Sequence, residues 1–426
     1  MQRKWRRDWE RSKPCRPQTG QGMTTLKRAA KAILPPLMAA GIMLSSMGIG
    51  CANPTGGQVT TGSGTISQSG NTMTINQYTN KLGINWQSFS IASGETVNFI
   101  QPGSSSIALN RVLGSDASGI YGHLNANGQV FLINPNGILF AKGASVNVGG
   151  LVASTLGLSD SDFLSGNYTF SGSGGSVTNQ GTITAASGGY VALLGSQVAN
   201  DGVIGAQKGT VALAAGSAVT LDFSGDGLLS LAVNQSAVDA SVANHNLIQA
   251  DGGQVVMTAS AANALARTVV NNSGVIQARS IDNTGGVIRL DGGTSGVVTN
   301  SGTLDASSKD FGQTGGTVKV LGETVALTDG AKVDVSGYAG GGTALIGGNF
   351  QGQGSEQNAT MTTVAAGATI NADATVQGNG GKVAVWADDK TVFNGQISAR
   401  GGAVGGNGGQ VETSGHIALK SATAPV

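Results

Sequence analysis

The acidic residues that lie closest together in the sequence are the first candidates for chemistry, because two carboxylates that flank a glycosidic bond can hydrolyse it. Three such pairs occur: Asp160 with Asp162, Asp222 with Asp226, and Asp388 with Asp389. None of them recurs after 28 residues, the interval at which units of this sequence repeat, and one such step from Asp305 leads to Val333. We therefore interpret these carboxylates as solvated turn residues.

The histidines and cysteines offer no other route to catalysis. His123, His245 and His416 lie far apart and have no Cys or carboxylate at metal-ligand spacing. Cys15 and Cys51, the two cysteines, both lie in a segment predicted to be removed, so the mature chain has no thiol nucleophile. The sequence also lacks a Gly-x-Ser-x-Gly elbow and a phosphate-cradling loop. We predict a non-enzyme without catalytic residues, metal ligands or cofactor.

Two segments with tryptophan could stack on a sugar ring, namely Trp86 and the stretch 382–386. Turn-side aromatics and buried core are the simpler interpretation of both, since large aromatic rings dominate protein cores. An exported β-helical enzyme that degrades polysaccharides stays an alternative. A cluster of acidic residues stacked on one face would favour it.

The most specific local pattern lies within residues 127–140. Two apolar runs flank the sequence Asn134, Pro135, Asn136 and Gly137, which fits the four positions of a type I turn. The first Asn caps the turn with its side chain, Pro sets φ at the second position, and Gly accepts a positive φ at the fourth. Taken alone, this pattern predicts a β-hairpin.

The composition predicts stacked short strands. Of the 426 residues, 70 are Gly, 39% are hydrophobic, 11% are charged and 4% are aromatic. A disordered chain usually combines low hydrophobicity with high charge, and this chain has neither. Small residues with abundant Val, Ile, Thr and Asn favour strands joined by tight turns.

Beyond residue 177 an apolar-x-Asn-x-Gly-x-apolar unit recurs. The residues at the Gly position of successive units are separated by 21, 44, 28, 28, 28, 37 and 28 residues, and we expect the interval of 44 to contain two units with an insertion near 222–227. Such a period is typical of stacked repeats. We predict an all-β fold, a right-handed parallel β-helix with an N-terminal cap and extra-helical β elements. The Asn side chains should hydrogen-bond from coil to coil.

The cap should come from the strands between Val59 and Phe99, because an open end of a β-helix exposes unpaired strand edges. Ser159, three residues before Asp162, predicts a short capped helical turn. No cap is recognisable near the other end of the sequence. We expect a short or truncated stem there.

Residues 1–52 have the pattern of a secretory signal. They carry ten Lys/Arg against two acidic residues, and an apolar run over 32–49 follows the basic part. Small residues before the boundary predict cleavage between Ala52 and Asn53. The signal is either extended, or the true start is Met23.

Two other interpretations of this segment are weaker. A transmembrane anchor would need a longer unbroken apolar run, and this one contains Pro35 and Pro36. Lipidation at Cys51 would require a Leu three residues upstream, where Gly48 stands. The first 52 residues have a balance of +8, which leaves −7 for the rest of a chain of net charge +1, so we expect no nucleic-acid partner.

The stretch 53–170 resembles the secretion domain of two-partner-secretion exoproteins, the filamentous-haemagglutinin-like family. Besides the turn, the landmarks that carry this resemblance are residues 54–57, 64–68, 84–89, 97–99, 109–112 and 149–155. The resemblance implies recognition by an outer-membrane β-barrel transporter of the two-partner type, passage in the unfolded state and folding at the cell surface. The secretion residues that it implies are Asn134, Pro135, Asn136, Gly137, Asn85, Trp86, Asn110 and Arg111.

We therefore expect a signal over 1–52, a secretion domain over 53–170 and a β-helical stem over 171–426. The expected product is a secreted or surface-exposed monomer that acts as an adhesin, with a host-cell or carbohydrate receptor. A degenerate fragment that is secreted but binds nothing is a further alternative. The sequence does not separate recognition from folding at the secretion residues, because either role explains the same motif.

Overall fold

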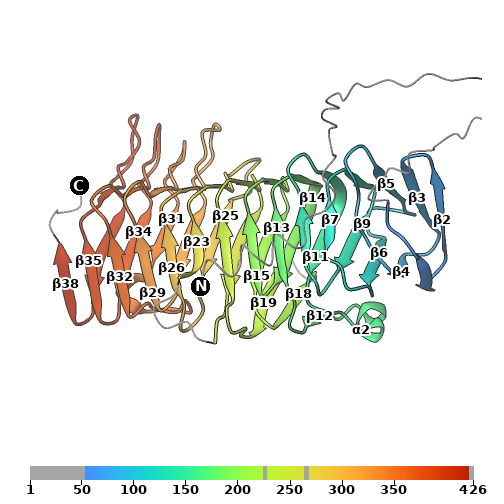
Figure 1. The fold of residues 1–426 in the computed structure, drawn as a ribbon. Helices are drawn as coiled ribbons and strands as arrows, with labels where there is room; N and C mark the ends of the chain where they lie inside the picture. Colours follow the sequence, from blue (N-terminus) through green and yellow to red (C-terminus); the bar gives the residue numbers. More distant parts are fainter. Residues whose placement is uncertain (1–52, 224–227, 263–267, 422–426) are drawn as a thin grey trace, which may run out of the picture. The chain divides into compact units, whose positions relative to one another are not determined.

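The structure, a computed structural model, describes residues 53–223, 228–262 and 268–421. The predicted signal segment, including Ala52 of the cleavage site, lies outside these residues, and Asn53 is the first residue described. From Asn53 onward the chain forms one compact unit, in which parallel strands stack coil upon coil (Figure 1). The predicted fold class, an all-β protein that forms a parallel β-helix, is confirmed.

The strand pairings define three faces of the β-helix. On the first face each strand pairs in parallel with its equivalent in the next coil. Its strands are β3 (Thr72–Gln77), β5 (Thr96–Ile100), β8 (His123–Ala126), the first parts of β11 (Ser145–Ser154) and β14 (Thr182–Gly195), β16 (Val203–Gly205), β21 (Leu247–Gln249), β24 (Val275–Gln277), β27 (Thr303–Asp305), β30 (Lys332–Asp334), β33 (Thr369–Asn371) and β36 (Gln396–Ser398).

The second face follows the first in each coil, and β11 and β14 run across both. Its strands are β4 (Lys81–Trp86), β6 (Ile107–Val112), β9 (Gln129–Ile133), the second parts of β11 and β14, β17 (Thr210–Ala215), β22 (Gln254–Ala259), β25 (Val287–Asp291), β28 (Thr317–Leu321), β31 (Thr343–Ile346), β34 (Lys382–Ala387) and β37 (Gln410–Gly415). All of these strands also pair in parallel.

The third face closes each coil with short parallel strands that form an 11-stranded sheet of their own. These strands are β7 (Ser118–Ile120), β10 (Ile138–Phe140), β13 (Ser176–Asn179), β15 (Gln197–Asn200), β20 (Ser241–Asn244), β23 (Thr268–Asn272), β26 (Val297–Asn300), β29 (Thr324–Leu327), β32 (Met361–Val364), β35 (Lys390–Phe393) and β38 (Ala418–Ser421).

Antiparallel strands cap the first coils, as predicted. β1 (Gln58–Thr61) pairs with β4 on the second face, and β2 (Gly64–Ser69) pairs with β3 on the first. Reversal of direction stops the parallel stack at this end, which protects its edge. The cap therefore occupies the part of the chain in which the sequence placed it.

Extra-helical elements leave the β-helix at the corner where the second face turns into the third. They are the helix α2 (Asp160–Ser165), the short 3-10 helix η1 (Phe350–Gly352), and an antiparallel sheet of β12 (Tyr168–Ser171), β18 (Ala218–Asp222) and β19 (Ser230–Gln235). Ser159 caps α2 by accepting the Asp162 backbone N–H, as predicted. A second apolar cluster joins α2 and this antiparallel sheet to the outside of the second face.

The interior of the helix is a stack of equivalent apolar side chains. One row on the first face consists of Ile183, Ile204, Ile248, Ile276, Leu304, Val333, Ile370 and Ile397. Each of these side chains is at most 3% exposed. Since only alternate residues of a strand point inward, this row explains the alternation in the sequence.

A ladder of buried asparagines runs along the corner between the third and first faces. Asn179, Asn200, Asn244, Asn272 and Asn300 are each 0% exposed. Each amide donates to the next one, over N–O distances of 2.8, 2.8, 2.8 and 2.7 Å. The predicted coil-to-coil bonding of the repeat Asn is confirmed, and it satisfies amides that would otherwise be costly to bury.

The interval of 44 residues is a single coil, so the prediction of two units within it is wrong. Val203 pairs directly with Leu247, and Thr210 with Gln254. The extra chain leaves the helix as the hairpin β18–β19 instead of adding a coil. Sequence spacing cannot distinguish these cases, because an insertion at a corner leaves the pairing of the flanking strands unchanged.

The expectation that Asp305 stacks beside no acidic residue is also wrong. Asp305 pairs in register with Asp334, because this coil is one residue longer than the 28-residue period. Both carboxylates bind locally: Asp305 accepts from the Ser307 backbone N–H at 3.0 Å, and Asp334 from that of Ser336 at 2.9 Å. Each therefore caps the turn that follows its strand.

Candidate functional site

The turn from Asn134 to Gly137 lies at the corner between the second and third faces. The Gly137 N–H donates to the Asn134 carbonyl at 3.1 Å, and the Asn136 N–H donates to Asn134 Oδ1 at 3.0 Å. Gly137 has a φ of 124°, a region that favours glycine. The predicted turn, with its side-chain cap, is confirmed.

The hairpin prediction for this segment is wrong. β9 before the turn pairs with β6 and β11, whereas β10 after it pairs with β7 and β13. The two strands thus belong to different faces of one coil, and neighbouring coils supply their backbone partners. A tight turn between apolar strands fits both arrangements, and only the stacking of coils decides between them.

The four turn residues divide into a buried and an exposed pair. Asn134 is 0% exposed, and its Nδ2 donates to the Asp116 carbonyl at 2.9 Å and to Ser118 Oγ at 3.0 Å. Pro135 and Asn136 are exposed, although Asn136 Nδ2 donates to the Gly114 carbonyl at 2.9 Å. The corner therefore presents Pro135 and Asn136 to solvent on a firmly bonded base.

Trp86 and Asn110 form a buried pair inside the same coils. They are 1% and 0% exposed, and Trp86 Nε1 donates to Asn110 Oδ1 at 3.0 Å. Asn110 Nδ2 in turn donates to the carbonyls of Ala108 and Phe131 at 3.1 and 3.3 Å. This pair joins three adjacent strands, and its burial prevents Trp86 from stacking on a sugar. Trp386, at 8% exposure, is likewise unavailable.

Arg111 and Asn85 lie side by side on the outside of the second face. They are register partners on β6 and β4, and Ile133 is the next residue in the row, directly before the turn. Arg111 Nη1 donates to Asn85 Oδ1 at 3.3 Å. Register thus brings Asn85 and Arg111 close to the turn, while Trp86 and Asn110 point into the core.

Two cations clamp α2 against this face. Arg111 Nη2 donates to the Leu158 carbonyl at 2.8 Å and pairs with Asp160 Oδ1 at 2.9 Å, at the start of the helix. Lys81 Nζ donates to the carbonyls of Phe163 and Leu164, at 2.7 and 2.9 Å, at its end. A cation at a helix C-terminus binds carbonyls that lack partners within the helix.

Sequence reasoning missed Lys81, because its partners lie more than 80 residues away. Its ammonium group also lies 5.5 Å from the ring centre of Phe163 and 5.7 Å from that of Tyr168. Burial lowers the pKa of Lys81 below its ordinary value, since desolvation disfavours the charged form. The only signal in the sequence was a lysine at the start of an apolar strand.

The described residues supply no group of three His, Cys, Asp or Glu side chains that could hold a metal ion. In the same residues we find no helix that is long and apolar enough to cross a membrane. His245 Nδ1 contacts Asp201 Oδ1 at 2.6 Å on the surface, a contact that the sequence spacing had not indicated. The candidate site is therefore a surface made of the turn from Asn134 to Gly137 and the helix α2, which Arg111 and Lys81 hold in place.

Comparison with known proteins places this architecture. The secretion domain of HMW1 from Haemophilus influenzae is similar in structure, with a TM-score of 0.77 and 32% identity, over 88% of this chain and 98% of that one. A heme/hemopexin-binding protein of H. influenzae is 35% identical over 246 residues, and another of the same name is 46% identical over 98.

These two stretches cover 56% and 23% of this chain, which spans 27% and 11% of the two relatives' length. The model of the TPS secretion domain, in which TPS stands for two-partner secretion, matches residues 51–306. Proteins with this domain are secreted or exposed at the cell surface by way of the periplasm. The chain belongs to the TPS secretion-domain family of two-partner exoproteins.

Proposed function

We propose that an outer-membrane β-barrel transporter recognises this chain through the corner of Asn134, Pro135, Asn136 and Gly137. The observation that carries the proposal is the division of the turn, in which buried Asn134 holds the loop and Pro135 with Asn136 faces solvent. A rigid exposed pair can contact a partner without unfolding. The same two residues are also accessible in an unfolded chain during transport.

The remaining secretion residues have different roles in this proposal. Asn85 and Arg111 extend the recognition surface, because they lie outside the second face and fix α2 beside the corner. Trp86 and Asn110 act in folding, since both are buried in the core. Residues 53–426 contain no Cys, so no disulfide would oppose passage through a pore in the unfolded state.

The test is secretion with and without the cognate transporter, for wild type and for Pro135→Ala, Asn136→Ala and Asn134→Ala. We expect transporter-dependent release of the wild type. Pro135→Ala should reduce release while the purified chain keeps its melting temperature, because only a solvent-exposed ring is removed. Asn134→Ala should lower both. Asn394→Ala, the same change at a half-buried corner of a C-terminal coil, is the control.

Equal release of the wild type with and without the transporter would overturn the two-partner route. Unchanged release of Pro135→Ala and Asn136→Ala would leave the route intact and remove the exposed pair from recognition. Because folding and release are measured on the same variants, the two roles of the motif can be separated.

Once at the surface, the chain acts in this proposal as an adhesin of the filamentous-haemagglutinin type, as a non-enzymatic monomer. The support is a long stack of coils with extensive exposed faces and relatives that are named for binding. Purified wild-type chain should coat surfaces and retain host cells, and it should elute from a sizing column as a monomer. Absence of cell retention would remove the adhesive role.

Binding of haem or hemopexin is the second candidate, favoured by the names of both curated relatives. Titration of the purified chain with hemin, followed by absorption, and capture of hemopexin on immobilised chain test it directly. A saturable spectral change or captured hemopexin would support this function over adhesion. If hemin causes no saturable spectral change and no hemopexin is captured, haem or hemopexin binding is excluded for the part of the relatives that this chain spans.

The non-enzymatic role also has a direct test, because Asp305 and Asp334 are stacked acidic residues. Each carboxylate already caps a turn through a serine N–H, which explains its place without catalysis. We expect no release of reducing sugar from polysaccharides. Release that Asp305→Asn abolishes would establish the polysaccharide-degrading alternative instead.

A further inference from the structure

Five loops project from the corner between the first and second faces, and we call them the finger loops (Figure 1). They comprise residues 278–286, 306–316, 335–342, 372–381 and 399–409. The equivalent loops of the two preceding coils, 206–209 and 250–253, are much shorter. Length beyond that needed to join two strands makes these loops candidates for binding.

Backbone hydrogen bonds join the finger loops to one another. The Gly315 N–H donates to the Gly340 carbonyl at 3.0 Å, and the Gly341 N–H to that of Asn379 at 3.1 Å. A Cβ at Gly341 would collide with the Ala372 carbonyl, so glycine is required for this close approach. The finger loops thus form an ordered layer that continues the stacking of the helix.

Apolar side chains follow one another along this layer. Phe311 and Val404 are 82% and 80% exposed, and the Phe311 ring lies 5.2 Å from that of Tyr338. The Val376 N–H donates to the Tyr338 carbonyl at 3.2 Å, and the Val404 N–H to that of Val376 at 2.8 Å. These four residues, which we call the finger ridge, therefore come from successive finger loops that the ring contact and the backbone hydrogen bonds connect.

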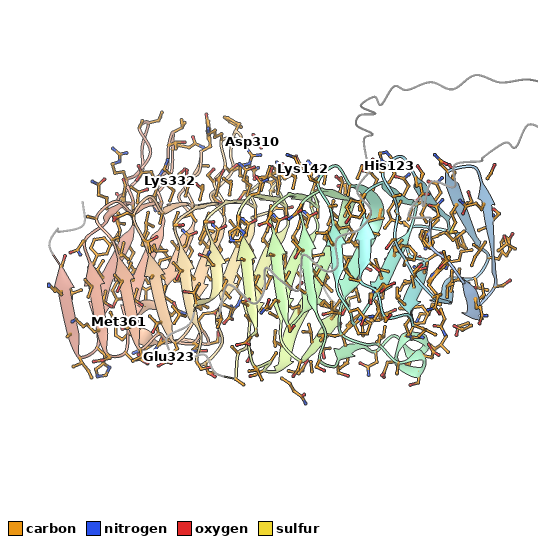
Figure 2. The ribbon with its side chains drawn as sticks, viewed as in Figure 1. His123, Lys142, Asp310, Glu323, Lys332 and Met361 are labelled. Atoms are coloured by element: carbon orange, nitrogen blue, oxygen red, sulfur yellow. The ribbon has the colours of Figure 1, made fainter. Side chains whose placement is uncertain are left out.

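Polar groups flank the aromatic end of the ridge. Asn283 and Gln313 form a hydrogen-bonded pair, in which Gln313 Nε2 donates to Asn283 Oδ1 at 2.7 Å and the Asn283 backbone N–H donates to Gln313 Oε1 at 2.9 Å. Asp310 precedes Phe311 in the chain and lies in the layer of finger loops (Figure 2). Lys309 balances its formal charge. The surface is therefore aromatic, amide-rich and close to neutral.

We propose that the finger ridge binds a neutral oligosaccharide. Sugar rings present apolar C–H faces that pack on aromatic rings, and Phe311 with Tyr338 provides two adjoining rings. Their hydroxyls need planar donors and acceptors, which the pair of Asn283 and Gln313 supplies. An anionic glycan would require an excess of cations, which this end of the ridge lacks. The inference deepens the proposed adhesion and rests on it for its biological use.

The test measures binding to the purified mature chain by saturation-transfer NMR with three defined probes. They are cellohexaose, mannohexaose and a hexasaccharide made of N,N′-diacetylchitobiose units. We expect at least one probe to bind, with transfer to ring protons. Phe311→Ala should weaken that binding about tenfold, the size expected for one good ring contact. Phe311→Tyr should restore it, since a ring of similar size returns. At 82% exposure, Phe311 can be changed without loss of folding.

Tyr78→Ala is the matched control, because Tyr78 is an aromatic residue at 62% exposure between β3 and β4, far from the finger loops in the chain. The affinity of the Tyr78→Ala variant for the probe should equal that of wild type. Absence of binding to all three probes, or equal binding by wild type and Phe311→Ala, would overturn the inference. So would binding of wild type, but not Phe311→Ala, to phosphatidylcholine vesicles in place of sugars.

Failure of this site and failure of the adhesive role are distinguishable. If the chain retains host cells but binds no probe, adhesion stands and the finger ridge is not its sugar site. If it binds a probe through Phe311 but retains no cells, the site stands and the adhesive role fails. Neither measurement depends on the transporter.

Discussion

The outside of the second face differs between the N-terminal and C-terminal coils, although a single row of residues runs through both. From Leu109 the row continues in register through Phe131, Val152, Ala192, Ala212, Val256, Arg289, Lys319 and Leu345. In the N-terminal coils it is apolar, and the elements α2, β12, β18 and β19 cover it. In the coils that follow, the same positions hold the charged residues Arg289 and Lys319, and the row is apolar again at Leu345.

A network of ion pairs holds the charged part of the row. Arg289 contacts Asp291 and Glu356, each at 2.7 Å, and Lys319 contacts Glu356 at 2.6 Å. Glu356 comes from the extra chain beside η1, so both halves of the face are covered by an insertion from the same corner. The comparison teaches that the interior fixes the coil, whereas the chemistry of the outer row decides which insertion can cover it.

The largest expected effect tests the apolar half. Phe131 is 0% exposed and packs against Tyr168 and Phe170, so Phe131→Ala should lower the free energy of unfolding by about 3–5 kcal/mol. Urea unfolding followed by circular dichroism measures it. Arg289→Leu, at the equivalent position of the charged half, should cost much less. Equal losses for the two variants would contradict the difference between the halves.

The next effect tests the asparagine ladder, which crosses from one half into the other. Asn244→Ala removes bonds to two neighbouring amides and leaves both partners buried, so we expect a loss of about 2–4 kcal/mol. Asn300→Ala removes one ladder bond and should cost roughly half of that. Thermal unfolding of both variants measures the order. A larger loss at Asn300 would show that position in the ladder does not set the cost.

A smaller effect concerns the clamp on α2. Arg111→Ala should cost about 1–2 kcal/mol, since it breaks one partly exposed ion pair and one charged hydrogen bond. Limited proteolysis should then cut within 155–172 sooner than in wild type. Lys142→Ala, which changes an exposed cation labelled in Figure 2, is the control and should leave the pattern unaltered. Unchanged cleavage in Arg111→Ala would mean that packing alone holds α2.

The smallest effect sharpens the charged half through pH. Burial alone would raise the pKa of Glu356, but hydrogen bonds from Lys319 and Arg289 and their charges outweigh it and hold the pKa below its ordinary value. The stabilisation is therefore complete above the unfolded-state pKa of about 4.3 and is lost as the pH falls through the lower folded-state value. We expect about 1 kcal/mol or less from this network.

Melting temperatures of wild type and Glu356→Gln, measured from pH 7 down to pH 3, check this prediction. The two curves should differ at neutral pH and converge in acid, because protonation of Glu356 removes the same charge as the substitution. Glu323→Gln is the matched control, since Glu323 accepts from Thr360 and forms no ion pair within the described residues. Parallel curves at all pH values would exclude a role for the Glu356 charge.

Local chemistry made a large part of the fold and of the candidate site predictable. The amide ladder followed from Asn recurring at one place in each unit, the turn from Asn134 to Gly137 from its four residue types, and the cap of α2 from Ser159. Each of these features depends on residues close together in the chain or on their identical place in successive units. Such patterns survive changes in the loops between them.

The register between coils was not predictable in the same way. Loops at the corners vary in length without changing which strands pair, so a fixed period placed Val333 beside Asp305, where Asp334 lies. For the same reason the interval of 44 residues resembled two units, and the turn at Asn134 resembled a hairpin. The interval between two units in the sequence includes the loop residues, whereas the register between coils depends only on the residues in the strands.

By itself, the sequence determined the solenoid, its apolar interior, its ladder of amides and the turn from Asn134 to Gly137, because all of these arise from repeated or adjacent residues. Only the tertiary structure decided that Lys81 and Arg111 clamp α2, that Phe131 and Arg289 share one row, and that Phe311 stands exposed beside Tyr338. These arrangements join residues from different coils, and their partners are set by stacking, which no local pattern records.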